Sequence, residues 1–477
     1  MSSRPAYTPL QLRRDPLISA EEIARIHDLA KRILAEIGLE ILDPAHREGL
    51  RAAGMKLKAN RLHLEPGMVD EYVDEMRLYI APGQTGETLP DSARISMNVS
   101  CYSLYVQDID SGSVVPYTTE RLTAMTRFVD SFADERVYGA PPGIPLDVHP
   151  DLQPLAQYRI AALNARQGAT PVDPTAPHTA LFLMEMAEAM GHPIHELPVY
   201  IPTPLRLGGE SLQVVMACLD RLEHISVSSM PATALSSPVQ PFGALALAAA
   251  EVIGGMIAVK VLTHKPVTCQ VNIFPGDLRE GSMVFGSPEN MNFQMLCSDV
   301  NRFYGWGPES GPGNYHVMAK SPDGQSAAEK AAIMMLGASL GARHFSCAGT
   351  LSLDEIFSPE QLLLDCEIRD WAEHAVRGVN LGENNAQDWL AEIRSGVSAN
   401  FMDLDSTLDF YQEQAWYPQR FVRGAIGPWL EKGQPRLSDR LQGEVKRRLA
   451  AHRFELEPAK RFEIERIYAA AERKTLG

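Results

Sequence analysis

The fold is decided by residues 225–274, which read ISVSSMPATALSSPVQPFGALALAAAEVIGGMIAVKVLTHKPVTCQVNIF. A short β-branched run at 225–228 precedes the long Ala- and Gly-rich stretch 242–262, and a second run follows at 267–274. This order predicts a strand, a helix and a parallel strand. The apolar stretch is long enough to span a membrane, but Glu251 stands near its centre, and a carboxylate there is costly in lipid. We therefore expect a buried helix packed closely on a sheet.

The alternation of strand and helix continues on both sides of this unit. Roughly eight strands, with a spacing of about thirty to forty residues per unit, predict an α/β fold, specifically a (β/α)8 TIM-type barrel. A doubly wound open sheet is the alternative, but no GxGxxG follows a strand and no P-loop sequence occurs, which weakens its nucleotide-binding forms. The expected strands are 97–107, 137–139, 169–172, 198–201, 225–228, 267–274, 307–311 and 343–347, and the expected helices include 152–166, 180–190, 212–222, 242–262, 288–304 and 327–340.

The two ends of the chain lack this alternation. We expect an N-terminal helical extension over residues 1–95, a barrel domain over 96–378 and a C-terminal helical cap over 379–477. Ser19 and Glu22 have the spacing of a capping box that opens the first helix. The helical extensions lead us to expect a homo-oligomer.

The charge and cysteine content exclude several classes of partner. The chain has 477 residues, with 44 Lys and Arg against 60 Asp and Glu, a net charge of −16. Nucleic acid and anionic membranes would repel such a chain, so we expect neither as a main partner. The six cysteines are scattered without a CxxC pair, which argues against a zinc knuckle or a redox motif. Because the first residues also lack the apolar core of a signal peptide, we expect a cytoplasmic protein with reduced thiols.

In such a barrel the active site lies at the carboxyl ends of the strands. The residues that follow the expected strands are mostly Gly, Pro and Ser, without a cluster at metal-ligand spacing, a nucleophile elbow or a lysine placed for a Schiff base. Aromatic residues near strand ends are Tyr102, Tyr105, Phe274 and Trp306. This composition suits a large flat cofactor face or a small, mostly apolar cation better than proton-transfer chemistry.

Several blocks in the same order carry a resemblance to a known family. They are 228–239 with the helix that holds Glu251, 286–289 leading to 302–305, 320–325 leading to Glu329, and 357–367. From about residue 16 to about residue 430 the chain resembles the corrinoid-dependent trimethylamine methyltransferase superfamily. Two segments depart from the family pattern, 235–237 and 403–407, and they leave the substrate open.

The resemblance implies a barrel that passes a methyl group from a methylamine to the cobalt of a separate corrinoid protein. Cobalamin or another corrinoid is then the methyl acceptor, and no metal is bound directly. The archetypal member uses pyrrolysine to bind trimethylamine, whereas this chain has only the twenty standard residues. When a quaternary ammonium gives up a methyl group, the leaving group is a neutral tertiary amine, so the reaction needs no general acid. Correct positioning of the substrate can then be enough for methyl transfer. We therefore expect a quaternary amine as substrate, glycine betaine first, then proline betaine, carnitine or butyrobetaine.

The resemblance also suggests roles for individual residues. Aromatic faces hold quaternary ammonium with about 0.5–2 kcal/mol each, so the substrate-binding candidates are Tyr102, Tyr105, Phe274 and Trp306, joined by Asn272 and His316 as partners for a betaine carboxylate. The catalytic candidates are Glu309, as a counter-charge, and His344, which alternation turns to the opposite face from Arg343. The corrinoid-facing candidates are Ser229, Lys320, Asp323 and Gln325.

Each of these residues also has a plainer interpretation, as core packing, a helix cap or a solvated loop. The alternatives for function are a demethylase or lyase acting on another betaine or a sulfonium, and a catalytically inactive betaine-binding protein. Both alternatives keep an aromatic cage, so the sequence separates them poorly.

Overall fold

Six parallel strands in two groups form the centre of the protein. The computed structural model describes residues 10, 12, 14–80, 94–167, 172–307, 313–380 and 388–477. One group has the order β11 (Val267–Cys269), β10 (His224–Ser229) and β8 (Glu196–Ile201), and the other has the order β14 (His344–Ala348), β4 (Ser96–Val99) and β7 (Val137–Tyr138). Both groups are parallel throughout.

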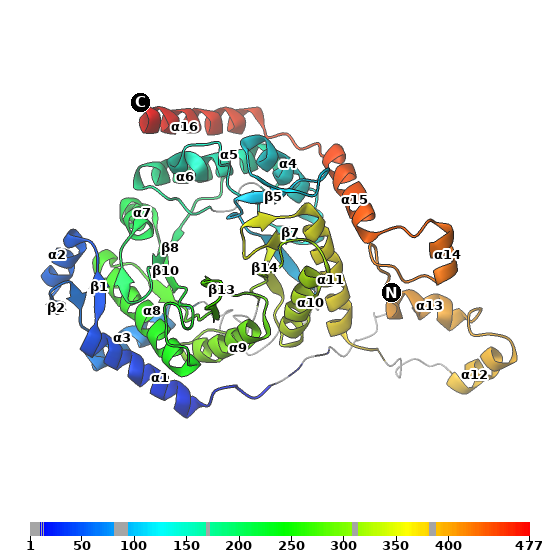
Figure 1. The fold of residues 1–477 in the computed structure, drawn as a ribbon, viewed down its shortest axis with the longest axis horizontal. Coiled ribbons are helices and arrows are strands. Elements are labelled where there is room, and N and C mark those ends of the chain that lie inside the picture. Colours follow the sequence, from blue (N-terminus) through cyan, green and yellow to red (C-terminus); the bar gives the residue numbers. More distant parts are fainter. Residues whose placement is uncertain are drawn as a thin grey trace.

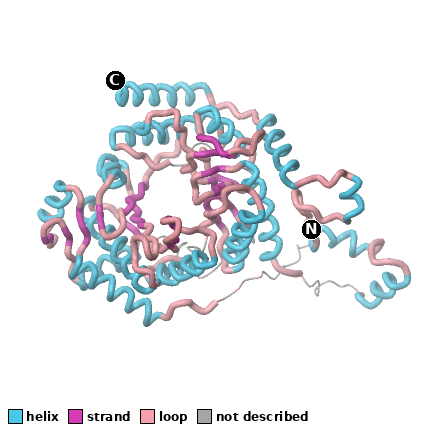
Figure 2. The backbone as a smooth tube through the Cα atoms, in the orientation of Figure 1, coloured by secondary structure: helices cyan, strands magenta, loops and turns pink. Residues whose placement is uncertain are grey.

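Helices surround these strands, as Figures 1 and 2 show. In chain order they are α4 (Thr119–Asp130), α5 (Gln153–Asn164), α6 (Pro177–Met190), α7 (Glu210–Cys218), α8 (Pro241–Thr263), α9 (Pro288–Phe303), α10 (Gly324–Ser339) and α11 (Pro359–Arg377). The predicted alternation of strand and helix is therefore confirmed as a mixed α/β fold. Within the described residues, the paired strands form two parallel groups of three and do not by themselves show a closed ring of eight.

The two remaining expected strands fall largely outside the described residues. Residues 168–171 and 308–312 are not among them, so the strands expected at 169–172 and 307–311 stay predictions. Next to the second segment, Asn314 forms an isolated parallel bridge with Ser346 of β14. The expected strand 97–107 is divided into β4 and β5 (Tyr105–Gln107).

Helix α8 is the apolar stretch that decided the fold. It is long and apolar enough to cross a membrane, and most of it is buried inside the protein. Two adjacent glycines let it approach its neighbours closely: a Cβ at Gly254 would lie 2.6 Å from Leu34, and one at Gly255 would lie 2.6 Å from Ile201. The helix contacts β10 and β11 on either side of it in sequence. The prediction of a buried helix packed on a sheet is confirmed.

The residues of the strands alternate between two environments. In β8, Leu197, Val199 and Ile201 are buried in the core between strands and helices. The alternate residues Pro198 and Tyr200 line an interior cavity of about 600 Å³. Strand β10 repeats this pattern, so the cavity is lined by residues of the strands' inner faces together with Tyr79, Ile80 and Trp306.

The N-terminal region contains a small sheet as well as helices. Ser19 and Glu22 form the predicted capping box at the start of α1 (Ala20–Arg32). A π-helical turn (Ile33–Ile37) follows, then β1 (Leu39–Ile41), α2 (Pro44–Ala52), β2 (Leu57–Lys58), β3 (Arg61–Leu62) and α3 (Pro66–Arg77). The prediction of a helical extension was thus incomplete. Strand β1 pairs in parallel with β9 (Arg206–Leu207), which follows β8, so this region shares a sheet with the central part of the chain.

Smaller sheets lie beside the two parallel groups. Strand β5 pairs with β6 (Val114–Pro116) and with β16 (Ile356–Phe357), which in turn pairs with β15 (Thr350–Leu351). A hairpin of β12 (Gly276–Asp277) and β13 (Ser282–Met283) follows β11. Figure 1 shows β13 over the middle of the ring of helices.

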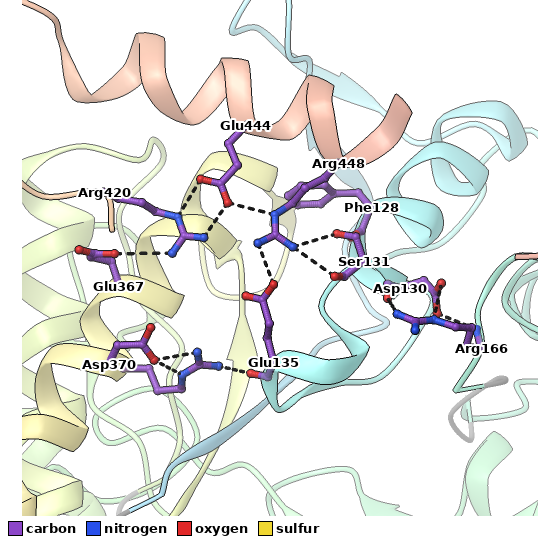
Figure 3. A network of polar contacts seen from close by, with 11 residues as sticks. Phe128, Asp130, Ser131, Glu135, Arg166, Glu367, Asp370, Arg420, Glu444 and Arg448 are labelled. Atoms are coloured by element: carbon purple, nitrogen blue, oxygen red, sulfur yellow. Dashed lines mark hydrogen bonds and ion pairs between the residues drawn. The ribbon is translucent and has the colours of Figure 1, made fainter. Parts of the chain in front are cut away.

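The C-terminal region is helical, as predicted. It consists of α12 (Trp389–Ser398), α13 (Asp405–Gln414), α14 (Ile426–Glu431), α15 (Leu437–Ala451) and α16 (Pro458–Leu476). Helix α15 is joined to α11 and to the turn after α4 by the ion-pair network of Figure 3, in which Arg448 pairs with Glu135 of that turn at 2.8 Å and with Glu444 at 3.0 Å. Arg420 links Glu444 to Glu367 of α11. Helix α16 packs on α5 and α6.

Candidate functional site

Two tyrosines and an aspartate meet at the carboxyl ends of β4 and β8. The Tyr102 hydroxyl donates a hydrogen bond to Asp173 Oδ2 at 2.5 Å, and the Tyr200 hydroxyl donates to the same oxygen at 2.8 Å. Tyr102 follows β4, and Tyr200 occupies an inward position near the end of β8. We call these three residues the tyrosine–aspartate cluster. Asp173 and Tyr200 also line a small cavity of about 260 Å³ beside the start of α7.

The cluster places a carboxylate against the hydroxyls of two tyrosines. Burial, and next the charge of Asp173, raise the pKa of both Tyr102 and Tyr200 above the ordinary range, so both hydroxyls stay protonated and remain donors. The two tyrosines are 42% and 43% exposed, which leaves ring surface free for a ligand. A carboxylate with adjoining aromatic faces is an arrangement that attracts a cation.

A second cluster lies close to the first, around the end of β14. His316 Nε2 is 3.1 Å from Cys347 Sγ, and His316 Nδ1 is bound to Asn314 Oδ1. Burial, followed by the charge of Lys330, lowers the pKa of His316 to about 3. Burial raises the pKa of Cys347 to about 12. Both groups are therefore neutral near pH 7, and the thiol donates to Nε2 while Nδ1–H donates to Asn314.

Cys101 connects the two clusters. Burial, and next the charge of Asp173, raise the pKa of the Cys101 thiol to about 12, and Cys347 contributes to the same shift. The Cys101 side chain is therefore near both Asp173 and Cys347. We consider the tyrosine–aspartate cluster and the histidine–cysteine pair together as one candidate site, because Tyr102 follows β4 and Cys347 lies in the neighbouring strand β14.

A buried ion pair fixes the backbone beneath the histidine–cysteine pair. Lys330 and Asp365 are fully buried with Nζ and Oδ2 3.4 Å apart, and Lys330 Nζ donates to the Cys347 carbonyl at 3.0 Å. Asp365 accepts from the Gly349 amide at 2.7 Å. Cys347 and Gly349 have φ values of +66° and +77°, a region that non-glycine residues rarely adopt. The ion pair therefore holds the bent end of β14 that presents Cys347.

Aromatic side chains extend the site. The rings of Phe274 and Phe285 have centroids 5.0 Å apart, and Phe285 lies 5.0 Å from the His316 ring. Asn272 is half-buried in the segment that leads to Phe274. Trp306 Nε1 donates to the Cys269 carbonyl at 3.0 Å, and the indole lines the interior cavity together with Tyr200. Four of the predicted residues, Tyr102, Phe274, Trp306 and His316, therefore lie near the carboxyl ends of the strands or beside the cavity that the strands line.

Other predicted residues lie elsewhere. His344 is the first residue of β14 and bonds to Ser96 Oγ at 2.9 Å and Asn98 Oδ1 at 2.8 Å. It therefore lies at the amino ends of the strands, away from both clusters. Tyr105 lies in β5, in the side sheet with β6 and β16. Glu309 lies outside the described residues.

Ser229 is the last residue of β10 and is buried on the face opposite the interior cavity. The carboxyl group of Glu251, a residue of α8, lies on that side of the strands. It accepts hydrogen bonds from Thr203 Oγ1 at 2.6 Å and from the Leu205 amide at 2.8 Å. Burial raises the pKa of Glu251. Ser229 thus lies against α8, and Glu251 holds the loop that follows β8.

The loop 320–325 is held by hydrogen bonds of its own. Asp323 caps α10 and accepts from the Gln325 amide at 2.8 Å, and the Gln325 side chain donates to Glu329 at 2.7 Å. Lys320 Nζ donates to Ser352 Oγ at 2.8 Å. These contacts give the loop a defined shape and account for its capping sequence. In the part of the chain that the structure describes, three or more His, Cys, Asp or Glu side chains do not come together at a metal-binding distance.

Sequence reasoning missed Asp173, Tyr200 and Cys347 as members of the site. Asp173 stands directly after an expected strand, and the other two lie within expected strands, so each carried a positional signal. Their pairing was not visible, because Tyr102 and Asp173 are 71 residues apart and His316 and Cys347 are 31 apart.

Comparison with known proteins gives consistent matches along the chain. A family model described as trimethylamine methyltransferase (MTTB) matches residues 7–475. The trimethylamine methyltransferase MttB of Methanosarcina barkeri is 24% identical over 456 residues, covering 88% of each chain. A glycine betaine methyltransferase of Desulfitobacterium hafniense is 21% identical over 434 residues, covering 87% of this chain and 88% of the relative. The solved monomethylamine methyltransferase MtmB of Methanosarcina barkeri superposes with a TM-score of 0.44 and 8% identity, over 92% of this chain and 89% of that one.

Proposed function

The chain belongs to the trimethylamine methyltransferase family, and from this premise we propose that it transfers a methyl group from a quaternary amine, glycine betaine in first place, to the reduced cobalt of a corrinoid. The observation that carries the proposal is Asp173, whose carboxylate accepts hydrogen bonds from the hydroxyls of two partly exposed tyrosines. A quaternary ammonium can balance this charge and contact the ring faces, because it has no proton to donate and its surface is apolar.

The chemistry of the leaving group favours a quaternary over a tertiary amine. Methyl transfer breaks the bond between the methyl carbon and nitrogen, and the bonding electrons stay with nitrogen. From a quaternary ammonium the departing group is a neutral tertiary amine, so no proton is needed. His316 and Cys347 are neutral and bound to each other, an arrangement that suits positioning better than acid catalysis.

The size of the cavities bears on how the methyl acceptor reaches the substrate. The cavities of about 260 Å³ and 600 Å³ are of the size that holds a small ligand, whereas a corrinoid macrocycle is far larger. We therefore propose that a corrinoid-binding partner protein presents the acceptor from outside, at the carboxyl ends of the strands. The capped loop 320–325 is a candidate contact for that partner, and Glu309 a candidate second counter-charge. Reduced corrinoid supplies a nucleophilic cobalt, and the protein supplies the orientation of the methyl group toward it.

The same proposal covers the fold and the location of the enzyme. We propose that the two parallel groups of strands are parts of one (β/α)8 barrel over residues 96–378, flanked by the extensions 1–95 and 379–477. The parallel bridge between Asn314 and Ser346 supports this, because it adds a neighbour to β14 on the side away from β4. A cytoplasmic location is supported by the six cysteines, all of which are unpaired.

The test combines the purified protein with chemically reduced cobalamin and a panel of donors. The panel contains glycine betaine, proline betaine, carnitine, trimethylamine and a sulfonium compound, and methylation of the cobalt is followed by its absorption spectrum. We expect transfer from glycine betaine and none from trimethylamine. Transfer only from the sulfonium compound, or tight binding of betaines without transfer to either free cobalamin or a corrinoid protein, would refute the proposal.

A further inference from the structure

Three polar side chains are hydrogen-bonded in a row at the amino ends of β8, β10 and β11. Glu196 is the first residue of β8, His224 is the first of β10, and Thr268 is the second of β11. His224 Nδ1 lies 3.1 Å from Glu196 Oε2, and His224 Nε2 lies 3.1 Å from Thr268 Oγ1. All three line the interior cavity of about 600 Å³. We call these residues the amino-end triad.

The amino-end triad is separate from the tyrosine–aspartate cluster. Glu196 and Tyr200 are the first and fifth residues from the start of β8, and both line the cavity. Four residues of a strand extend about 13 Å, and Tyr200 binds Asp173 at the far end. One small methylammonium ion therefore cannot contact Glu196 and Asp173 together. In Figure 1, β8 and β10 lie inside the ring of helices, so both ends of the cavity belong to the interior of the fold.

The amino end of the cavity carries a negative charge. The hydrogen bond from His224 holds the pKa of the Glu196 carboxyl below its ordinary value, so the carboxylate is ionised near pH 7. The described residues that line the cavity include no lysine or arginine. Lys260 donates to the hydroxyl of Tyr79 in the cavity wall at 2.8 Å, but Glu75 balances its charge at 2.9 Å. A cation is therefore attracted to this end of the cavity.

The free hydrogen-bonding positions of the triad are acceptors. An ionised carboxylate can only accept, so neutral His224 carries its proton on Nδ1 and donates it to Glu196. His224 Nε2 then accepts from the Thr268 hydroxyl, whose oxygen keeps its lone pairs for a ligand. The Glu196 side chain is 55% exposed, which leaves carboxylate oxygen free. A cation with an N–H donor can satisfy these acceptors, whereas a quaternary ammonium has no donor.

We propose that the amino-end triad is a second binding site, for a protonated methylamine that keeps at least one N–H. The N–H donates to the Glu196 carboxylate. Its methyl groups have apolar contacts available at Tyr79 and Ile80, which line the same cavity. These two residues lie at the amino end, because Tyr79 is bonded to Lys260 in the last turn of α8, shortly before β11 begins.

The site distinguishes the two sides of the proposed reaction. A quaternary amine that has lost a methyl group is a tertiary amine, and its nitrogen takes up a proton from water and so gains an N–H. The amine product therefore fits the amino-end triad, and its quaternary precursor does not. This role in the reaction rests on the proposed function, whereas the binding of a protonated methylamine does not.

Equilibrium dialysis of the full-length protein with two probes, at about pH 8, tests the site. Trimethylammonium keeps one N–H, and tetramethylammonium has the same charge and none. The Asp173→Asn variant is used because it weakens cation binding at the tyrosine–aspartate cluster. We expect this variant to bind trimethylammonium about 5- to 10-fold more tightly than tetramethylammonium, because only the first probe forms a charge-assisted hydrogen bond. Adding Glu196→Gln should raise the dissociation constant of trimethylammonium about 5- to 10-fold, because it removes the charge of a half-exposed carboxylate.

Glu223→Gln, added to Asp173→Asn, is the matched control. Glu223 also pairs with a histidine, His195, at 3.5 Å, but its side chain is 78% exposed and is not among the described residues that line the cavity. This substitution removes the same charge and should leave the binding of both probes unchanged. Both glutamates are exposed enough that circular dichroism should show the same folding in all variants.

Three results would overturn the proposal: equal binding of the two probes by Asp173→Asn, no loss of trimethylammonium on adding Glu196→Gln, or an equal loss with Glu223→Gln. The dialysis contains no corrinoid, so no methyl transfer takes place in it. A protein that fails to transfer a methyl group can still bind trimethylammonium at the amino-end triad, and the two failures are therefore distinguishable.

Discussion

Replacing Asp173 with asparagine removes the charge between the two tyrosines and preserves the shape of the side chain. The asparagine carbonyl can still accept the hydrogen bonds that Tyr102 and Tyr200 now donate to Oδ2 at 2.5 Å and 2.8 Å. The substitution therefore tests whether the charge, and not only the cavity, binds the substrate.

The size of the effect follows from the distance and the solvent exposure. A cation about 4.5 Å from the carboxylate gains about 4 kcal/mol at an effective dielectric constant of about 20 and about 1 kcal/mol in water. Because Tyr102 and Tyr200 are 42% and 43% exposed, the lower part of this range applies, about 1–2 kcal/mol. We expect the dissociation constant of glycine betaine to rise about 5- to 30-fold.

Titration calorimetry with two ligands isolates the charge. Glycine betaine carries a quaternary nitrogen, and 3,3-dimethylbutanoate has the same shape with a neutral carbon in its place. Asp173→Asn should weaken the first ligand and leave the affinity of the second unchanged or slightly higher. The control variant Tyr105→Phe, in the side sheet, should alter neither. If Asp173→Asn weakens both ligands equally, or neither, the carboxylate does not act as the counter-charge.

Three further predictions concern stability. Lys330→Met should lower the free energy of unfolding by about 3–5 kcal/mol, because it leaves the buried charge of Asp365 unpaired. Urea denaturation measures this, and adding Asp365→Asn should restore part of the loss, because asparagine is neutral and can still accept from the Gly349 amide. In the unfolded chain His316 has an ordinary pKa of about 6.5, whereas in the folded chain burial lowers its pKa to about 3. Between about pH 6.5 and pH 3 the unfolded chain therefore binds one more proton than the folded chain. The free energy of unfolding should fall by about 1.4 kcal/mol for each pH unit below about 6.5 because of this residue. Urea titrations of the unaltered chain and His316→Gln at pH 7, 6 and 5 check it, and parallel losses in the two proteins would contradict it. Arg448→Ala should increase hydrogen exchange in α15, because the side chain joins Glu135 to that helix and lies 4.0 Å from the centre of the Phe132 ring; unchanged exchange there would show that the network of Figure 3 does not hold the helix.

The secondary structure of the central region was predictable because its signals are local. The capping box at Ser19, the strand at 225–228 and the apolar helix 242–262 each follow from a few adjacent residues, and each is present. The small N-terminal sheet was missed because β1 and β3 are only three and two residues long, too short for a period of two to appear.

The site was less predictable because it depends on where strands end. Alternation assigns a residue to one face of a strand but does not say at which end of the strand it lies, so His344 was expected near the substrate and lies at the amino end of β14. The position of Tyr105 was not predicted because the expected strand 97–107 is interrupted: β4 ends at Val99 and β5 begins at Tyr105. At the start of β5 the Leu104 and Tyr105 amides donate to the Glu355 carbonyl. That contact joins residues some 250 positions apart, and no local pattern predicts it.

The most direct test of the central claim is the stoichiometry of a single methyl transfer. The protein is mixed with reduced cobalamin, or with a reduced corrinoid protein, and glycine betaine that carries deuterated methyl groups, and both products are quantified by mass spectrometry. We predict one deuterated methyl group on cobalt for each molecule of dimethylglycine formed, and no transfer when dimethylglycine or trimethylamine replaces the betaine. Equal transfer from trimethylamine, or dimethylglycine formed without methylation of the cobalt, would contradict a site built for a donor that already carries its positive charge.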